Sequence, residues 1–540
     1  MKLLSPLILI LLTAVSPLVA QQTAGAPDSP VEPANALRLS MDGAIEAATQ
    51  NNLGVSIQRV DFQMAEQTRR GAWAPFDWLT SATIETSSQE RPVTSVIFSP
   101  VSETTVANVG VQQTLPTGAN YTVGFNNQKQ ASNNPFITFN PAFTTGLNLG
   151  FTQPLLRNFG VDVNTRGIRI ARNNLGISEE SFRSVMLDTV LGVQQAYYDL
   201  IAARRNLEVR RQSLDLVRDQ ERITQIRIDV GAAAPLDILQ PRVDIALREE
   251  EVIIGEAAIR AAEDRLRQLM NLPGSEWDRP IVPTDTVAFA PMEVDVEAAV
   301  ARAYQLRPEV EQAELTIDTR EIQHLYARNQ RLPQLDFRVD YGYAGVGGTE
   351  IVRDPVTGDQ IGTVAGGYGD ALDQVYGFDF PSWTVGFNVG MPVRNIGARA
   401  EARRAELEVL RSREDVARVK QNVAVRVRQT ARDIETASRQ IVASRAARDA
   451  AEQNLEAEQK RFENGMTTNF QVLQAQRDLA DARSREIAAL VGYNKSIASY
   501  HHAVGDLLEH HDIELDLPET GKTGVRWERV RWLNFGNYAD

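Results

Sequence analysis

The amino-acid sequence predicts a mostly α-helical protein of two structural repeats, each with a long helical hairpin and with β-strands of the membrane type. Three observations lead to this fold class. The stretch RFENGMTTNFQVLQAQRDLADAR, residues 461–483, echoes the stretch RIDVGAAAPLDILQPRVDIALRE, residues 227–249. Each stretch follows a long segment without proline. Upstream of each segment, apolar and polar residues alternate over runs of about 9–11 residues, which is the pattern of a membrane β-strand.

The chain begins with the features of an export signal. Met1 and Lys2 give a positive start, an apolar run follows, and small residues surround a cleavage point near Ala20. This pattern predicts a signal peptide over residues 1–20. A retained membrane anchor is the alternative, but the apolar run is short and contains two prolines. Residues 21–36 have the Pro, Ala, Ser and Gly bias of a disordered linker.

The composition excludes several classes of protein and of site. The chain has no cysteine, which excludes disulfides, thiolate metal sites and the lipid-bearing cysteine of a bacterial lipoprotein. Its net charge is −14 and no basic stripe dominates the chain, and both observations argue against a nucleic-acid partner. No stretch after the signal reaches the ~20 apolar residues that a transmembrane helix needs.

The internal repeat divides the chain into two copies of about half its length. The first repeat is expected over residues 37–270 and the second over residues 292–505, separated by a proline-rich linker at 271–291 and followed by a tail at 506–540. Each repeat is expected to open with one helix. Ser40 caps this helix in the first repeat, and its counterpart starts near Met292.

Two very long helices follow from the proline-free segments. Residues 164–228 and 399–464 repeat apolar side chains at helical spacing, and a helix of about 65 residues spans on the order of 100 Å. The tip glycines Gly231 and Gly465 suit the left-handed turn that commonly ends a helix. Pro241, which the second copy lacks, is expected to kink the first returning helix. Periodicity alone also fits a coiled-coil scaffold.

The strand pattern indicates a sheet with one polar and one apolar face, with strands at about 77–153 and 334–393. In LDFRVDYGY and WTVGFNVGM, large apolar residues alternate with Asp336, Arg338, Asp340 and Asn388, which we expect to line a barrel lumen. A soluble sheet with one wet face is the alternative. We count two strands in the second half and two to four in the first. Because an open sheet edge is not tolerated in a bilayer, several chains would have to share one barrel.

The first half contains a candidate extra hairpin at about residues 104–130. Its strands are ETTVANVGVQQT and ANYTVGFNNQ, joined by the tight turn LPTG. Short turns on one side and longer loops on the other are typical of membrane barrels, so we expect this hairpin to add strands to the barrel. A surface insertion outside the membrane is the alternative.

In its motifs the chain resembles the TolC-like outer-membrane efflux protein family, from Leu37 to about Gly505. The resemblance rests on the opening pattern Leu39, Ala44, Ile45, Ala48 and Asn51, on PLLRNFG at 154–160, on its second copy PVRNIG at 392–397, and on the glycine tips followed by Leu-Gln. It implies a homotrimer with long helical hairpins forming a periplasmic α-barrel and with a shared trimeric β-barrel. The linker and tail would form an equatorial belt, and the extra hairpin would make the pore wider than is usual in the family.

The same resemblance assigns roles to the two tips. A periplasmic membrane-fusion adaptor protein would contact Val230, Gly231 and Ala232 in one turn and Asn464, Gly465 and Met466 in the other. The family has acidic gate residues six and nine positions beyond the tip glycine. Here Asp237 matches in the first copy, whereas Gln471 and Gln474 stand at those places in the second copy. The gate should therefore have less negative charge than the family's usual ring.

Enzyme and cofactor functions are not supported by the sequence. The GKT at 521–523 lacks the first glycine of a phosphate loop, because Asp516 stands there. The glycines of GYAGVGG lead into no helix. His501, His502, His510 and His511 come without a carboxylate arrangement that would complete a metal site. We therefore expect no catalytic, cofactor or metal site.

The function expected from the resemblance is that of a passive exit duct. The chain would be an outer-membrane channel-tunnel of a Gram-negative-type bacterium, surrounded by outer-membrane lipid and extending into the periplasm. It would serve a tripartite efflux or type I secretion system, with an adaptor and an inner-membrane RND or ABC transporter opening the tip. A periplasmic coiled-coil structural or adaptor protein is the alternative. An adaptor would be expected to carry a compact β-rich domain between the two halves of one hairpin, which the sequence does not show.

Overall fold

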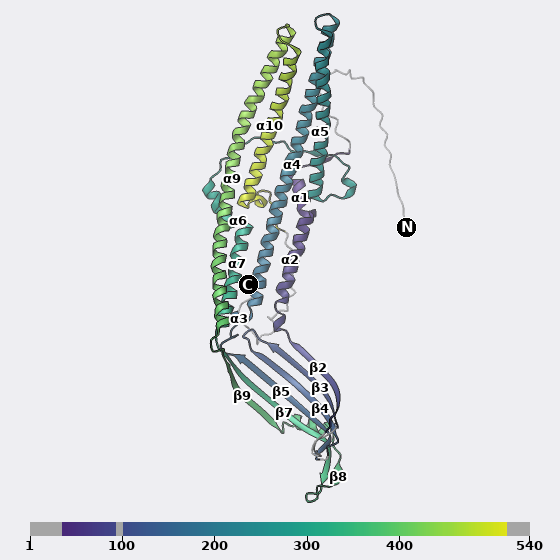
Figure 1. The fold of residues 1–540 in the computed structure, drawn as a ribbon, viewed down its shortest axis with the longest axis vertical. Helices are drawn as coiled ribbons and strands as arrows, with labels where there is room; N and C mark the ends of the chain where they lie inside the picture. Colours follow the sequence, from purple (N-terminus) through teal and green to yellow (C-terminus); the bar gives the residue numbers. More distant parts are fainter. Residues whose placement is uncertain (1–34, 93–100, 135, 516–540) are drawn as a thin grey trace, which may run out of the picture.

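The computed structural model describes residues 35–92, 101–134 and 136–515. The protein is elongated, with a twisted sheet at one end and two helical hairpins that point away from it (Figure 1). The predicted signal peptide, nearly all of the predicted linker at 21–36, and residues 516–540 of the tail lie outside the described residues. Among the described helices, none combines the length and apolar character that crossing a bilayer requires.

The chain is built from two repeats, as predicted, and each has two opening helices, strands, one long helix and one returning helix. In the first repeat the elements are β1 (Leu37–Leu39), α1 (Met41–Asn51), α2 (Leu53–Gly71), η1 (Ala74–Phe76), β2 (Leu79–Glu90), β3 (Val101–Thr114), β4 (Asn120–Ser132), β5 (Phe139–Pro154), α3 (Val161–Asn164), α4 (Arg166–Asp229), η2 (Pro235–Ile238) and α5 (Leu239–Met270). The linker contributes η3 (Gly274–Glu276) and β6 (Ile281–Pro283). The second repeat contains α6 (Val296–Leu306), α7 (Pro308–Asn329), β7 (Gln334–Arg353), β8 (Gln360–Val364), α8 (Tyr368–Tyr376), β9 (Pro381–Gly390), α9 (Ile396–Glu463), α10 (Asn469–Val504) and α11 (Leu507–His510).

The single opening helix predicted for each repeat is wrong, because each repeat opens with two helices. Ser40 caps α1 as predicted, and its side chain accepts the N–H of Gly43. Asn52 then ends α1 in an extended conformation, and its side chain accepts the N–H groups of Gly54 and Val55 to start α2. In the second repeat Pro308 is the first residue of α7, and a proline there forces the preceding Arg307 out of the helical region.

The two long helices determine the length of the molecule. Helix α4 has 64 residues and α9 has 68, so each is about 100 Å long at ~1.5 Å per residue. Helices α5 and α10 return along them to give two hairpins, and α10 packs against α4 to join the hairpins into one body (Figure 1). The predicted mostly helical fold with two long hairpins is confirmed.

The apolar core lies at mid-height, where the two repeats meet. Its first cluster surrounds the fully buried Tyr197 and Leu200 of α4, and its second surrounds Ile441 of α9 and Tyr493 of α10. Leu507 of α11 is buried in the first cluster, whereas Phe289 of the linker packs on the Tyr493 ring with centroids 5.1 Å apart. Linker and C-terminal segment therefore cross between the hairpins and bind the repeats to each other.

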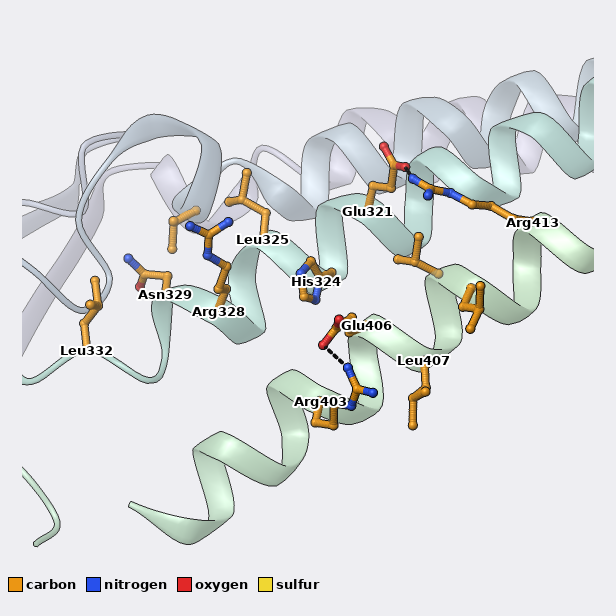
Figure 2. Close-up of a pocket in the computed structure, with 13 residues that line it drawn as sticks. Glu321, His324, Leu325, Arg328, Asn329, Leu332, Arg403, Glu406, Leu407 and Arg413 are labelled. Carbon is orange, nitrogen blue, oxygen red and sulfur yellow. Dashed lines mark hydrogen bonds and ion pairs between the residues drawn. The ribbon is translucent and has the colours of Figure 1, made fainter. Parts of the chain in front are cut away.

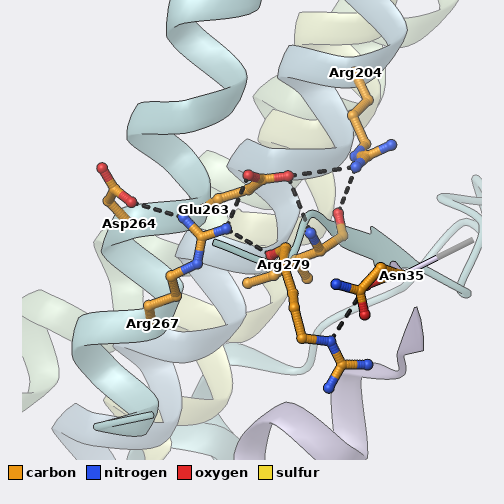
Figure 3. Close-up of polar contacts among 7 residues, drawn as sticks. Asn35, Arg204, Glu263, Asp264, Arg267 and Arg279 are labelled. Atoms are coloured by element: carbon orange, nitrogen blue, oxygen red, sulfur yellow. Dashed lines mark hydrogen bonds and ion pairs between the residues drawn. The ribbon is translucent and has the colours of Figure 1, made fainter. Parts of the chain in front are cut away.

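A buried polar cluster fixes the linker to the first hairpin (Figure 3). Glu263 and Arg267 of α5 are each 5% exposed and form an ion pair of 3.2 Å. The Glu263 carboxylate also accepts the N–H of Ile281 in β6 at 3.1 Å, and Arg204 of α4 donates to the Ile281 carbonyl at 2.6 Å. Strand β6 in turn pairs in parallel with β1. Charge and backbone bonds together hold the linker at the middle of the molecule.

The sheet has seven strands in the order β2-β3-β4-β5-β7-β8, and β9 pairs with β7 beside β8. All its pairings are antiparallel. The first half thus supplies four strands, the upper end of the predicted range. The second half supplies β7 and β9 as predicted, but sequence analysis missed the short strand β8 and the helix α8 that connect them. Their GGYGDALDQVY segment is too short to show a clear helical period.

We predict that replacing Glu263 with Ala lowers the free energy of unfolding by about 3 kcal/mol, because it removes the buried partner of Arg267 and the acceptor of the buried Ile281 N–H. Arg267 keeps its ion pair with the exposed Asp264 and its bond to the Arg279 carbonyl. Chemical unfolding in detergent measures this change. The matched control is Glu256→Ala on the same helix, whose ion pair with Arg211 is about half exposed and should contribute no more than about 1 kcal/mol. Equal effects of the two substitutions would contradict a structural role for the buried cluster.

Candidate functional site: helical tips and two-faced sheet

The two hairpin tips have the same backbone geometry. Gly231 has a φ of 75° and Gly465 a φ of 70°, so both adopt the left-handed conformation predicted for them. At the first tip the N–H of Ala232 donates to the carbonyl of Arg227 at 2.7 Å, and at the second the N–H of Met466 donates to the carbonyl of Arg461 at 2.8 Å. These bonds satisfy the last carbonyls of the long helices. The sequence echo therefore encodes one turn, used twice.

The tip residues Val230, Gly231, Ala232, Asn464, Gly465 and Met466 are all exposed at the far end of the molecule. The two turns differ just beyond the glycine. In the second hairpin α10 begins at Asn469, whereas in the first a 3₁₀ turn at Pro235–Ile238 precedes α5. Pro241 then lies in the first turn of α5, where backbone N–H groups have no partner within the helix, so the proline costs no helical hydrogen bond. The 3₁₀ turn takes the place of the kink that we predicted inside a continuous helix.

The three predicted gate residues make their hydrogen bonds within their own hairpins. The carboxylate of Asp237 accepts the N–H of Ala234 at 3.0 Å and so stabilises the 3₁₀ turn. Gln471 is exposed, and the amide of Gln474 donates to Asp478 at 2.9 Å. Asp237 therefore has a local structural role in addition to the charge that it places near the tip.

Several contacts join the hairpins below their tips, and sequence analysis missed the three that lie nearest the tips. Arg477 of α10 donates to the two carboxylate oxygens of Asp244 in α5 at 2.5 and 2.7 Å, and Asp244 is only 2% exposed. The amide of Gln220 in α4 donates to Asn469 at 2.7 Å. The Arg227 guanidinium lies 4.3 Å from the centre of the Phe462 ring. In the two echoing stretches Asp244 stands at the position of Asp478, but this match does not indicate a partner for Asp244 in the other hairpin.

The sheet has one polar and one apolar face, most clearly in the rows that cross β4, β5, β7 and β9 near the helices. Asp336 lies opposite Asn388, and Thr122, Gly150, Asp340 and Thr384 share one row across four strands. Arg338 and Asp340 form an ion pair of 2.5 Å on this face. The neighbouring row on the other face contains Val123, Leu149, Tyr341 and Trp383. The predicted lumen residues therefore share one face, which the strand register makes continuous.

Aromatic side chains collect at two levels of the apolar face. Near the helices, Trp78 and Tyr121 meet edge to face at 6.3 Å, and Phe337 lies against Phe387 at 5.3 Å. Farther from the helices, Tyr343 contacts both Tyr341 and Phe378. Two aromatic levels flanking an apolar band are the pattern of a sheet that faces lipid on one side.

Helix α8 packs on the apolar face at the end of the sheet that is remote from the helices. Two glycines of β7 allow this approach, since a Cβ at Gly345 would lie 2.0 Å from the carbonyl oxygen of Ala371, and one at Gly347 would lie 2.4 Å from that of Gly367. The hydroxyl of Tyr368 donates to Asn127 of β4 at 2.7 Å. The exposed rings of Tyr376, Phe378 and Phe380 extend the outer aromatic level.

Opposite sides of the helical body carry complementary apolar features. On one side Leu53, Ile57, Val60 and Met64 form an exposed stripe along α2, at spacings of four, three and four residues. On the other side, a groove of about 930 Å³ runs between α7 and α9 just above the sheet (Figure 2). Leu325, Leu332, Leu407 and Leu410 line this groove, together with the Arg403–Glu406 and Arg413–Glu321 ion pairs.

The C-terminal histidines have partners within the fold. His502 contacts Asp188 of α4 at 2.8 Å, and this hydrogen bond holds the pKa of Asp188 below its usual value. The ring of His510 stacks on that of His501 at 4.5 Å, and burial lowers the pKa of His510. Among the described residues, no group of three or more His, Cys, Asp or Glu is placed to hold a metal ion.

Comparison with known proteins identifies the family. The family model described as outer membrane efflux protein matches residues 118–272 and 299–499, which together make up more than half of the chain. The chain belongs to the outer membrane efflux protein family. The two matched segments cover the hairpin of each repeat and leave the linker between them.

Individual relatives agree with this assignment. The outer membrane protein TolC of Vibrio cholerae serotype O1 is 23% identical over 337 residues, which are 62% of this chain and 71% of that protein. The CmeC outer membrane channel of Campylobacter jejuni has the same fold at a TM-score of 0.62 with 13% identity, covering 88% of this chain and 90% of CmeC. VceC of Vibrio cholerae gives a TM-score of 0.61 with 14% identity, covering 86% of this chain and 96% of VceC. The family resemblance is confirmed.

We predict that Gly231→Ala destabilises the first tip by about 1–2 kcal/mol, because a side chain is disfavoured at positive φ even though open space surrounds this position. Gly231→Asn is the matched control and should lose less, since asparagine tolerates the left-handed conformation. Hydrogen exchange of the amides of residues 226–234 measures the change. Equal exchange in the two variants would show that φ does not limit this turn.

Proposed function

We propose that three copies of this chain form a passive exit duct, with the sheet in the outer membrane and the helical hairpins extending into the periplasm. The observation that carries this proposal is the combination, in one chain, of a two-faced sheet with two helices of about 100 Å that end in hairpins. The polar face with Asp336, Arg338, Asp340 and Asn388 would line the pore, and the apolar face would meet lipid. Energy would come from an inner-membrane pump of the RND or ABC class.

The sheet edges support assembly with further copies. Strand β2 is exposed along its whole length. Within the part of the chain that the structure describes, β2 pairs only with β3, and β9 pairs only with β7. Unpaired backbone groups have no hydrogen-bond partners inside a bilayer, so each edge needs another strand. Edge β2 of one copy and edge β9 of the next would supply this pairing. Such a head-to-tail contact uses two different surfaces and closes into a ring.

The helical body offers a second head-to-tail contact between neighbouring copies, in the same direction as the pairing of β2 with β9. Helix α2, which carries the stripe, lies on the side of β2, and helices α7 and α9, which line the groove, lie on the side of β9 (Figure 1). The stripe and the groove both lie in the half of the helices next to the sheet. A ring that pairs β2 with β9 therefore brings each stripe toward the groove of the neighbouring copy, where burial of four apolar side chains would add several kcal/mol.

The tips would form the gate and the adaptor site. Three copies present six similar turns around one axis, and the exposed residues Val230, Gly231 and Ala232 or Asn464, Gly465 and Met466 are available to a periplasmic adaptor protein. The contacts between Asp244 and Arg477 and between Gln220 and Asn469 hold the two hairpins of one chain together below the tips. Opening would require these hairpins to separate.

Mass measurement of the full chain in detergent, together with cell fractionation, tests the proposal. We expect three chains in one particle and a location in the outer membrane. A soluble periplasmic monomer would overturn the duct and favour a coiled-coil structural or adaptor protein.

We predict that Arg477→Gln increases the conductance of the channel in planar bilayers. The substitution leaves the buried Asp244 carboxylate unpaired and weakens the closed arrangement of the hairpins. A loss of about 1.4 kcal/mol would raise the open population about tenfold. The control is Arg439→Gln on α9, which breaks an exposed ion pair within one helix. If the two variants conduct like the parent protein, the contact does not hold the gate.

We predict modest cation selectivity in planar bilayers, carried largely by Asp237. Three carboxylates near one axis attract cations, whereas the amides of Gln471 and Gln474 contribute hydrogen bonds. Asp237→Asn should weaken the selectivity while its amide oxygen still accepts the N–H of Ala234. Replacing Gln471 and Gln474 with Asp should strengthen the selectivity and introduce block by divalent cations. Unchanged selectivity in both variants would place the constriction elsewhere in the tunnel.

A further inference from the structure

The β3–β4 hairpin lies within the sheet rather than outside it. Strand β3 pairs with β2 from Val101 to Gln112, and with β4 on its other side from Ser102 to Thr114. Strand β4 continues the pairing to β5 over Asn120 to Gln130. The hairpin therefore separates β2 from β5 along nearly the full height of the sheet. Six strands of ten residues or more belong to this sheet, namely β2, β3, β4, β5, β7 and β9, and β9 pairs with β7 from Gln334 to Tyr343.

The turn of this hairpin is built into the junction between sheet and helices. The N–H of Gly160 donates to the carbonyl of Thr117 at 3.1 Å, and the amide of Gln153 donates to the same carbonyl at 3.3 Å. Gly118 has a φ of 91°, and a Cβ there would lie 2.4 Å from the carbonyl oxygen of Asn158. Asn158 and Gly160 belong to the PLLRNFG step. A hairpin displaced from the sheet would lose this fit.

A buried amide also fixes β3 to the first repeat. Gln113 is 9% exposed and donates to the carbonyl of Phe76 in η1 at 2.8 Å, and the hydroxyl of Tyr121 in β4 donates to its oxygen at 2.6 Å. Strand β3 thus contacts the segment that leads from α2 into β2, and Tyr121 of β4 contacts the same segment through the Trp78 ring, with centroids 6.3 Å apart.

The two faces of the sheet continue through the half of the hairpin nearer the helices, whereas farther out Glu103, Asn127 and Lys129 lie on the same face as the apolar residues. Val109 lies opposite Phe125 and Val111 opposite Val123 on the apolar face, while Gly110 lies opposite Gly124 on the polar face. On the polar face, the side chains of β3 and β4 are Ser, Thr, Val, Asn and Gln, with no charge. Near the helices the hairpin therefore has one face suited to lipid and one suited to water, like the strands on either side.

We propose that the β3–β4 hairpin spans the membrane and that three copies form a barrel of eighteen strands, six from each chain. This inference rests on the proposed assembly into a shared barrel. At a strand spacing of ~4.8 Å and a tilt of ~40°, eighteen strands give a backbone diameter of about 36 Å, whereas the twelve strands left without the hairpins give about 24 Å. The membrane end is then wide and weakly charged, and size selection falls to the helical tips.

Single-cysteine labelling tests the hairpin directly, because the parent chain has no cysteine. Asn108→Cys and Thr122→Cys place a thiol on the polar face, and Val109→Cys and Val123→Cys place one on the apolar face at the same heights. In outer-membrane vesicles, a charged maleimide should label the first two and leave the lipid-facing two unlabelled. Labelling of all four at similar rates would overturn the inference and indicate a hairpin in water.

Electron cryo-microscopy of the full chain in lipid nanodiscs gives the strand number. We expect a trimer with eighteen strands. A trimer with twelve strands, in which β2 pairs with β5 and the hairpin lies outside, would overturn the inference and leave the proposed duct intact. A particle without a shared barrel would overturn the proposed function itself.

Discussion

The unpaired edges of the sheet are the constraint on which the rest of the structure depends. Each chain presents β2 and β9 as open edges, and the apolar face between them has the aromatic levels of a membrane surface. In water such edges could be solvated. In a bilayer they must pair, and a chain with six long strands pairs them most simply with copies of itself. Assembly is in this sense a consequence of backbone hydrogen bonding, which side-chain contacts then refine.

In the proposed assembly, the ring formed at the sheet would continue into the helical part. Each long strand pair leads through a step, PLLRNFG in the first repeat and PVRNIG in the second, into a helix of about 100 Å. The linker and the C-terminal segment cross between the hairpins at mid-height, where the Glu263–Arg267 pair and the Tyr493 contacts hold them. Above this level, polar contacts such as those of Asp244 with Arg477 and of Gln220 with Asn469 join the two hairpins.

The sequence predicted the repeated elements well, because long helices, tip glycines and alternating strands each have a period or a conformational requirement of their own. The split at Asn52 was missed because its side chain caps a new helix within an unbroken apolar pattern. Helix α8 was missed because nine residues are too few to show a period. The Asp244–Arg477 contact joins residues 233 positions apart, and only the packing of α10 against α4 brings their helices together. The hydrogen bond from the Ala234 N–H to Asp237 could not be predicted either, because it depends on the 3₁₀ turn.

Cross-linking of the two sheet edges tests the central claim most directly. Thr83→Cys on β2 can be combined in turn with Thr384→Cys, Gly386→Cys and Asn388→Cys on β9, all on the polar face. Within one chain these strands are five strand spacings apart, about 24 Å, which no disulfide can bridge. Edge pairing between copies predicts that at least one combination oxidises to a covalent trimer in denaturing gels. Exclusively monomeric chains at every position, or disulfides formed only within a chain, would contradict the shared barrel.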